Sequence, residues 1–403
     1  MSDVTPRLRR PYRWAVLLAY LPVIGLSQLL WLNFADLQGF VQKQYGVSEF
    51  LASTLILVFP LLYVFLSVPA GNLIDRRGYR FAIGGGAVVM AISSLIRLGD
   101  VSFWALLAGQ TGIALAQPYI VNGVSKLVMD WFDAEEGALA TGLATMGMFI
   151  GMAAGMATSA ALPKAIGLHA TMGIFGLISV AAAILFLVVV RPNGAATAPG
   201  SAEPSGGLLQ LLGNGQLRLL TILIFLGMGE FNGLATFLEQ ILGAHQVSPS
   251  DAGNVGAVLV GGGIVGAVVI PGLSGWLGRR KPFLLLAVGV ALLTLYPLCE
   301  ASDLKTLYVL SAVHGFFFLP AVALMLDLAA QIAGPALAGA SASLLMLAGN
   351  AGGVVIILAG QALLDPDATA RGVVILLIAS LAIASALGLS LTETRPVPAV
   401  EPA

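Results

Sequence analysis

Long apolar segments separated by short polar ones run through the whole chain. Crossing a bilayer core takes about 20 apolar residues. Lipid offers backbone polar groups no partner, so each such segment must be helical. The pattern therefore predicts an all-α membrane protein with twelve transmembrane helices. The segments lie near residues 14–38, 50–73, 80–98, 102–126, 136–161, 168–190, 217–242, 253–275, 282–299, 305–330, 338–364 and 372–391.

One polar connection, residues 191–216, is longer than the others and rich in Pro, Gly, Ala and Ser. This composition is typical of a flexible linker. It divides the chain into an N-terminal half, 1–190, and a C-terminal half, 217–403, with six predicted helices each. The halves behave like internal repeats, so we expect two pseudo-symmetric six-helix halves joined by a cytoplasmic linker. The residues that align between the halves are Pro118 with Pro320, Gly147 with Gly349 and Gly151 with Gly353.

Composition narrows the class of protein further. The 403 residues are 58% hydrophobic and only 10% charged, whereas a soluble domain has about 25% charged residues. The net charge of −1 does not indicate a nucleic-acid partner. The single cysteine, Cys299, excludes an intramolecular disulfide and a cysteine-based metal site. No nucleophile–base pair or nucleotide-binding loop is recognisable, so we predict a protein that is not an enzyme and uses no cofactor or metal.

The basic residues predict the orientation in the membrane, because cytoplasmic loops carry an excess of Lys and Arg. If the N-terminus is cytoplasmic, fourteen of the 19 Lys and Arg residues fall in inner segments. The outer segments then carry Lys43, Arg97, Lys164, Lys305 and Arg371. We therefore expect a multi-pass protein of the inner (cell) membrane with both termini in the cytoplasm.

The stretch Gly-Asn-Leu-Ile-Asp-Arg-Arg-Gly-Tyr-Arg at 71–80 lies between the second and third apolar segments. It resembles the loop signature G-x-L-x-D-R-x-G-R-R of the major facilitator superfamily. The resemblance implies a secondary transporter that works by alternating access around a central site. In that superfamily the acid of the signature, here Asp75, interacts with a helix N-terminus of the other half and with a nearby Arg, which holds the inner side shut. The gating candidates in the signature are Gly71, Asp75, Arg76, Gly78 and Arg80.

Two further interpretations concern the inner side. The basic residues of the signature can act as topology markers, with or without a gating role. Lys126 and Asp327 lie near the inner ends of the fourth and tenth segments. We predict that they pair across the two halves as an inner gate.

A narrower resemblance covers most of the chain. The segments "QYGVS" at 44–48, "GQTGIALAQPY" at 109–119, "HGFFFLP" at 314–320 and "ASASLLMLAGNAGG" at 340–353 are similar to the feline leukaemia virus subgroup C receptor-related family. Relatives in that family carry choline, ethanolamine or, by some accounts, haem. Its choline-transporting members bind the quaternary ammonium group with aromatic rings and place glutamine side chains beside it.

Carried over residue by residue, this resemblance implies a substrate site. Trp31 and Gln117 match the family's first-helix tryptophan and fourth-helix glutamine, and Asn350 falls where the family has a glutamine. Asn232, beside Phe231, replaces a family aromatic, which weakens the case for choline itself because a cation prefers two or more aromatic faces. The alternative roles are core packing for Trp31 and a helix–helix hydrogen bond for Gln117.

Glu230 lies in the middle of the seventh segment, with no Lys or Arg within ten residues of it. Ionisable groups inside a membrane are costly and point to function. Burial favours the protonated form, which suits a proton-coupling site or a counter-ion for a cationic substrate. A structural hydrogen-bond donor is the alternative. Residues 230 and 232 are about 200° apart on a helix, so we expect them on different faces.

Other polar residues in or near the segments are interpreted more simply. Asp36 and Glu239 lie toward the outer ends of the first and seventh segments. We expect them to be solvated or to line a gate. His314 lies inside the tenth segment, where packing is the favoured interpretation.

Together these features predict a monomeric secondary active transporter. Its substrate would be a small organic solute such as an amine or quaternary ammonium compound, and its driving force would be protons. The first alternative is a proton-linked exporter of hydrophobic drugs. Such exporters commonly have an arginine in the fourth helix, where Gly109-Gln110 stands here. The second alternative is a non-transporting membrane receptor, which a flux assay in liposomes would distinguish.

Overall fold

The computed structural model describes residues 6–99, 102–132, 134–191, 211–333, 338–364 and 370–392. Regular secondary structure in these residues is helical throughout. The N-terminal helices are α1 (Pro6–Leu32), α2 (Gln38–Tyr45), α3 (Glu49–Arg77), α4 (Tyr79–Ile96), α5 (Phe103–Trp131), α6 (Ala134–Ser159), α7 (Ala161–Ile166) and α8 (Leu168–Val189). The C-terminal helices are α10 (Gly215–Gly243), α11 (Pro249–Leu277), α12 (Lys281–Glu300), α13 (Leu304–Phe318), α14 (Pro320–Ala333), α15 (Ala338–Ala362) and α16 (Arg371–Gly388).

The chain forms two compact units. The first unit comprises Met1–Ala202 together with Ala235–Ala257, and the second comprises Glu203–Leu234 and Val258–Ala403. Helices α10 and α11 therefore each contribute one end to the first unit. Most of the predicted linker, residues 192–210, lies outside the described residues, so the predicted division at 191–216 stays a prediction.

The predicted transmembrane segments correspond closely to the observed helices. Within the described residues, eleven helices or helix pairs are long and apolar enough to cross a membrane. The predicted fourth segment corresponds to α5, which is not among the eleven but has 29 residues. At 1.5 Å per residue α5 is about 44 Å long, enough to cross a bilayer. It carries Gln110, Gln117 and Asn122, which make it less apolar than the others.

The structure corrects three details of the prediction. The first segment was expected to continue to residue 38, but α1 ends at Leu32 and a separate short helix, α2, begins at Gln38. The tenth segment is divided between α13 and α14, directly before Pro320. Proline lacks a backbone N–H and so disfavours a continuous helix at this point, although Pro118 lies inside the unbroken helix α5. The short helix α7 was not predicted.

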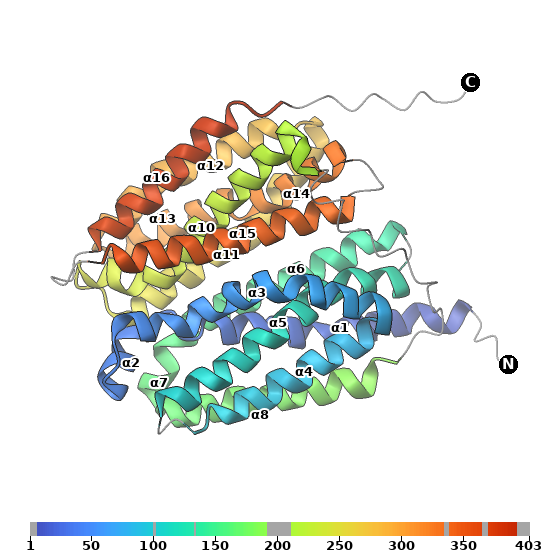
Figure 1. Ribbon diagram of the computed structural model, residues 1–403, viewed down its shortest axis with the longest axis horizontal. Helices are drawn as coiled ribbons and strands as arrows, with labels where there is room; N and C mark the ends of the chain where they lie inside the picture. Colours follow the sequence, from blue (N-terminus) through green and yellow to red (C-terminus); the bar gives the residue numbers. More distant parts are fainter. Residues whose placement is uncertain are drawn as a thin grey trace. The chain divides into compact units, whose positions relative to one another are not determined.

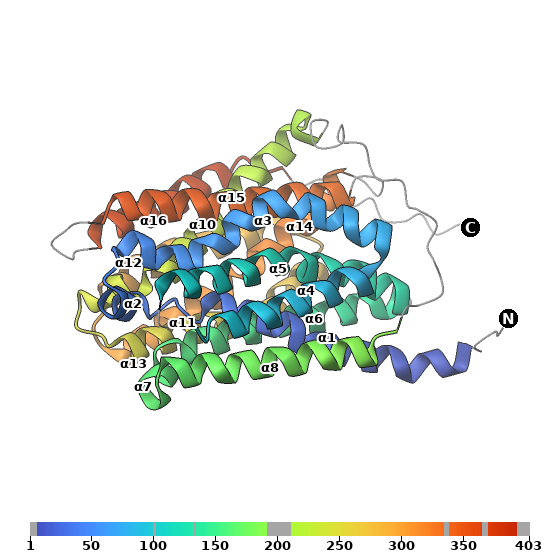
Figure 2. The same cartoon turned by 60° about the horizontal axis from the view of Figure 1, so that its bottom comes forward.

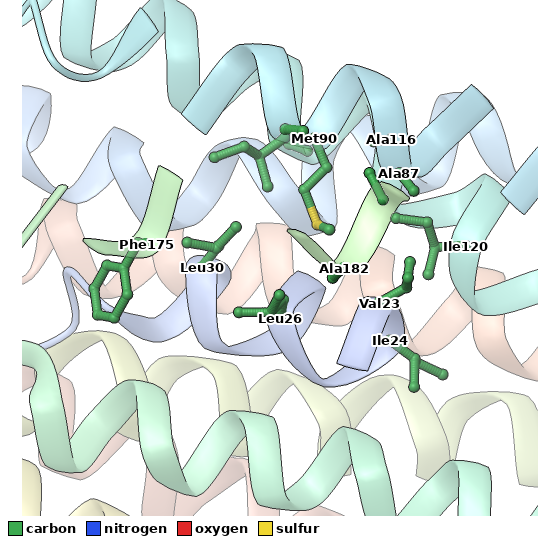
Figure 3. Packing of buried hydrophobic residues seen from close by; sticks show 14 of the residues in the cluster. Val23, Ile24, Leu26, Leu30, Ala87, Met90, Ala116, Ile120, Phe175 and Ala182 are labelled. Carbon is green, nitrogen blue, oxygen red and sulfur yellow. The ribbon is translucent and has the colours of Figure 1, made fainter. Parts of the chain in front are cut away.

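In the first unit, α4 packs against α5 and α8, and α1 packs against α6 and α8. Figures 1 and 2 show these helices running side by side, in blue, cyan and green. Buried apolar side chains fill the space between α1, α4, α5 and α8 (Figure 3). They include Val23, Leu30, Met90, Ile120 and Phe175, all buried. This core fixes the rotation of α1 and α5, on which the candidate substrate residues lie.

Glycine allows the closest helix crossings in both units. A Cβ atom at Gly151 of α6 would lie 2.0 Å from the carbonyl oxygen of Gly25 in α1. In the second unit, a Cβ at Gly352 of α15 would lie 1.9 Å from the carbonyl oxygen of Phe225 in α10. Only a residue without a Cβ permits such contacts. The same pair of helices thus meets through glycine in each unit, as expected of internal repeats.

Candidate functional site

The turn between α3 and α4 contains the loop signature. Gly78 separates the two helices with φ +81°, a conformation that favours glycine. Its backbone N–H donates to the Ile74 carbonyl at 2.8 Å. Arg80 donates from Nε to the carbonyl of Val190 and from Nη2 to the carbonyl of Leu187. A cation at the C-terminal end of α8 is favourable for the helix dipole, so Arg80 ties the signature turn to α8.

The remaining signature residues lie on the last turns of α3. Gly71 is half-buried and Arg76 is exposed. The side chain of Asp75 lies outside the described residues. The gating role of the signature therefore stays a prediction, while Gly78 and Arg80 have a clear structural role in the turn.

Lys126 and Asp327, predicted to pair across the halves, each have a partner within their own unit. Lys126 Nζ lies 3.7 Å from Asp130 Oδ1, one helical turn away. Asp327 Oδ2 accepts from Arg280 Nε at 2.8 Å and from Gln331 Nε2 at 3.0 Å. Arg280 lies in the stretch Gly-Trp-Leu-Gly-Arg-Arg-Lys at 275–281, where α11 ends and α12 begins, and sequence reasoning did not assign it as a partner of Asp327. The Lys126–Asp327 pair itself stays a prediction.

Trp31 and Gln117 are the candidate substrate residues of the first unit. Trp31 is half-buried near the end of α1, and its ring centroid lies 6.3 Å from that of Phe59 on α3. Gln117 on α5 is buried. The indole Nε1 of Trp31 and the amide Nε2 of Gln117 are both buried and have no hydrogen-bond acceptor among the described residues. Two unmet donors leave room for an acceptor supplied by a ligand, because buried polar groups are normally satisfied.

Asn232 and Asn350 bond in the same way in the second unit. Asn232 Nδ2 donates to the Met228 carbonyl at 2.7 Å, and Asn350 Nδ2 donates to the Met346 carbonyl at 2.9 Å. Both residues are buried, as is Phe231. Asn232 lies against Gly353 of α15. A side-chain amide that bonds back to its own helix keeps its orientation before any ligand arrives.

Glu230 is completely buried in α10, and its carboxyl group faces α13. Its Oε1 lies 3.7 Å from Nε2 of His314. Neither carboxyl oxygen has a hydrogen bond within the described residues. Asn232 faces α15 instead, so the expectation that residues 230 and 232 point in different directions is confirmed.

The role first assigned to His314 was incomplete. The ring does pack against Phe318, with centroids 5.4 Å apart. It is also the neighbour of Glu230, which sequence reasoning missed because the two residues are far apart in the chain. A histidine inside a membrane segment was the signal that could have suggested an acid as its partner.

The two outer acids are less exposed than predicted. Asp36 is 0% exposed, so the expectation that it is solvated is wrong. Its backbone N–H donates to Ser159 Oγ at 3.1 Å. Glu239 is half-buried and accepts from the backbone N–H of Gln38 at 2.8 Å. A role of either acid at a gate stays a prediction.

Arg97, expected in an outer polar segment, is also fully buried. Its Nη1 donates to Gln110 Oε1 at 3.1 Å, and Gln110 Nε2 donates to the Leu30 carbonyl at 2.9 Å. The side chain occupies space that glycine leaves free, since a Cβ at Gly109 would lie 2.5 Å from Arg97 Cγ. Gly109 and Gln110 therefore form the space and the hydrogen-bond partner for Arg97, which follows the neighbouring helix α4.

Comparison with protein families identifies the fold. Residues 14–357 match the model of the Major Facilitator Superfamily. The chain belongs to the major facilitator superfamily. The predicted fold class is therefore confirmed, and the protein is a multi-pass membrane transporter.

This major facilitator transporter is similar to several curated proteins. It is 25% identical over 362 residues to the choline/ethanolamine transporter FLVCR2 of Homo sapiens, covering 82% of this chain and 68% of that protein. It is 30% identical over 288 residues to solute carrier family 49 member A3 of Danio rerio, covering 68% of this chain and 60% of that protein. The expected resemblance to the feline leukaemia virus subgroup C receptor-related family is thus confirmed.

Solved structures agree on the fold. A bacterial homolog of the human lysosomal transporter Spinster, in an inward-facing and unoccupied conformation, matches with a TM-score of 0.71 at 17% identity. That match covers 96% of this chain and 99% of the other. The nucleoside transporter NupG matches with a TM-score of 0.74 at 13% identity, covering 94% of this chain and 100% of the other. At these identities the likeness shows a shared fold only.

Proposed function

We propose that this transporter moves a small organic amine or quaternary ammonium compound by alternating access, driven by protons. The observation that carries the proposal is the pair of unmet donors on Trp31 and Gln117 in the first unit. The interaction of a cation with the face of a tryptophan ring contributes about 1–2 kcal/mol of binding free energy when the site is desolvated. Choline and ethanolamine, named for the curated relatives, each combine such a cation with a hydroxyl oxygen that can accept a hydrogen bond.

Each site residue has a separate role in this proposal. Trp31 offers the ring face to the cation, and Phe59 supports that ring from the neighbouring helix. Gln117 donates to the hydroxyl oxygen. Phe231, Asn232 and Asn350 are the candidate contacts contributed by the second unit, and Glu230 is the candidate for proton coupling or for pairing with the cation.

The gating part of the proposal rests on the signature turn. Gly71, Asp75, Arg76, Gly78 and Arg80 would control the inner side, and Lys126 and Asp327 are two further gating candidates. The transporter would lie in the inner membrane as a monomer with both termini in the cytoplasm. It would need neither a cofactor nor a metal, and its partners would be the substrate, protons and lipid.

Uptake by proteoliposomes tests this function. Purified protein is reconstituted, and entry of labelled choline or ethanolamine is followed with and without a pH gradient. We expect saturable uptake that a pH gradient increases, with liposomes containing Trp31→Ala protein as the matched control. Binding of the label without any flux would instead indicate a receptor.

One observation favours a second function, the export of hydrophobic drugs. Drug exporters of this superfamily place an arginine in the fourth membrane helix, which corresponds to α5 here. Arg97, directly after the end of α4, bonds to Gln110 of α5 and therefore lies in the same neighbourhood. Competition separates the two proposals. Inhibition of choline uptake by other amines supports the amine carrier, whereas inhibition by lipophilic drugs alone supports the exporter.

A further inference from the structure

A buried acid and a buried imidazole meet inside the second unit. Glu230 of α10 is 0% exposed and His314 of α13 is 1% exposed. Their nearest atoms, Oε1 and Nε2, are 3.7 Å apart. This distance is too long for a hydrogen bond but close enough that a small side-chain movement would make one. The described residues offer Oε1, Oε2 and Nε2 no other hydrogen-bond partner.

Contacts on the far side of the ring determine which imidazole nitrogen carries hydrogen. Thr294 Oγ1 of α12 lies 3.0 Å from His314 Nδ1. The hydroxyl donates its single hydrogen back to its own helix, to the Val290 carbonyl at 2.8 Å. A hydroxyl that donates to its own helix can only accept from the ring, and this arrangement assigns the hydrogen to Nδ1 of His314.

This arrangement leaves Nε2 of a neutral His314 as an acceptor pointing at Glu230. A protonated Glu230 carboxyl can donate to it, and moving that same proton across gives a carboxylate beside an imidazolium. Both forms contain one proton between Oε1 and Nε2 and have no net charge. A neutral pair avoids the large cost of an isolated charge inside the membrane.

We propose that Glu230 and His314 together form one buried proton-binding site. This site extends the proposed coupling role of Glu230. The site itself does not depend on the proposed function, and only the use of its proton in transport rests on that function. Release transfers the proton from Oε1 to water and leaves a carboxylate, while the Nδ1–H bond to Thr294 stays unchanged. Uptake reverses these steps. His314 is thus a positioning residue that makes Glu230 hold a proton.

Among the described residues, few other titratable groups lie near Glu230 and His314. On α12, Cys299 lies close enough to interact electrostatically with Glu230, and Glu300 follows it at the end of that helix. On α15, the neighbours of this part of α10 are Gly352 and Ile356, which do not titrate. On α13, Phe318 lies one turn from His314 and packs on its ring. Within 4 Å of the carboxyl, His314 is the ion-pair partner among the described residues.

Infrared difference spectroscopy of the purified transporter tests the site without any transport. A protonated carboxylic acid has a C=O stretch that a carboxylate lacks, and hydrogen bonding shifts it. We expect the wild type to show such a band and Glu230→Gln to lose it. In His314→Leu the band should move to the position of an acid without an acceptor, while Thr294→Val should produce a smaller shift. Asp303→Asn, which removes an exposed acid of the same unit, should leave this band unchanged.

Two results would overturn the proposal. One is an identical carboxyl spectrum in the wild type and Glu230→Gln, which would mean that Glu230 carries no proton. The other is an unshifted Glu230 band in His314→Leu, which would mean that the two side chains do not share one. Circular dichroism and thermal melting identify a variant that fails to fold, and His314→Phe, whose side chain also lacks an acceptor, then replaces His314→Leu. A failure of proton-driven uptake with these spectra intact would overturn the coupling in the proposed function but not the site.

Discussion

Glu239 of α10 caps the N-terminus of α2, the short helix that begins at Gln38. Its Oε2 accepts from the Gln38 N–H at 2.8 Å, and its Oε1 lies 3.3 Å from the Gly39 nitrogen, which also donates. The residue in the N-cap position, Leu37, has no side chain that could bond these groups. An acid is favourable at a helix N-terminus. The C-terminal part of α10 is therefore joined to α2 within the first unit.

Removing this cap should loosen α2. We expect Glu239→Ala to destabilise the protein by about 1 kcal/mol, as loss of a helix cap does. Thermal melting measures the loss. In a Cys299→Ser background, a cysteine placed at buried Val41 should react faster with a thiol reagent once α2 is uncapped. Glu300→Ala, at an exposed position, is the control. Equal labelling of both variants would contradict the capping role.

The glycine crossing of α1 and α6 gives a second prediction. Gly151→Ala should cost about 1–3 kcal/mol, because the new methyl group would overlap the Gly25 carbonyl. Gly142→Ala on the same helix meets nothing within 4 Å. It should be neutral or stabilise by up to about 1 kcal/mol through helix propensity. Melting temperatures of the two purified variants check this, and a similar loss in both would contradict it.

The number and length of the apolar segments were enough to predict the fold. Each long segment must be helical in lipid, so the boundaries of α3 (Glu49–Arg77) or α12 (Lys281–Glu300) follow closely from the sequence. The helices α2 and α7 were missed because neither is long enough to cross a membrane. Repeat alignment paired Gly151 with Gly353, yet the closest contact is made by Gly352, since small differences in helix rotation are not visible in a sequence.

The candidate site was less predictable, because it depends on which side chains face each other. Glu230 stood out as an isolated acid, but its partner His314 lies on another helix and only packing brings the two together. Arg97 seemed to belong to a polar outer segment, although space left by Gly109 allows it to turn inward. Sequence spacing gives the direction of a side chain within one helix and cannot give the neighbour that it meets.

The proposed aromatic site predicts that removing its side chains lowers the affinity for choline. Trp31→Ala should weaken choline binding by about 1–2 kcal/mol if the cation rests on the indole face. Gln117→Ala should also lower affinity without affecting expression. Trp104→Ala removes a tryptophan that is 64% exposed and should leave binding unchanged. Calorimetric titration of the purified variants with choline measures this, and unchanged affinity in the Trp31 and Gln117 variants would remove the site assignment.

The loop signature predicts a shift between conformations. Asp75→Asn should keep the fold but increase the inward-open population, because the acid that would hold the inner side shut has lost its charge. Labelling of introduced cysteines from the two sides of the membrane measures the population. Asp303→Asn neutralises a fully exposed acid whose N-cap role asparagine retains, so it should label like the wild type. An unaltered pattern in Asp75→Asn would leave this acid with a topological role alone.

The proposed role of Glu230 predicts that replacing it affects two transport assays differently. If the residue couples transport to protons, Glu230→Gln should abolish uphill uptake driven by a pH gradient. Counterflow exchange, which needs no net proton movement, should survive, because glutamine keeps the shape of the side chain but cannot release a proton. If Glu230 instead pairs directly with a cationic substrate, the same variant should lose both activities. Its burial against His314, away from the face that carries Asn232, favours the first outcome. Full activity of Glu230→Gln in both assays would leave Glu230 as a structural hydrogen-bonding residue and assign the coupling to another acid.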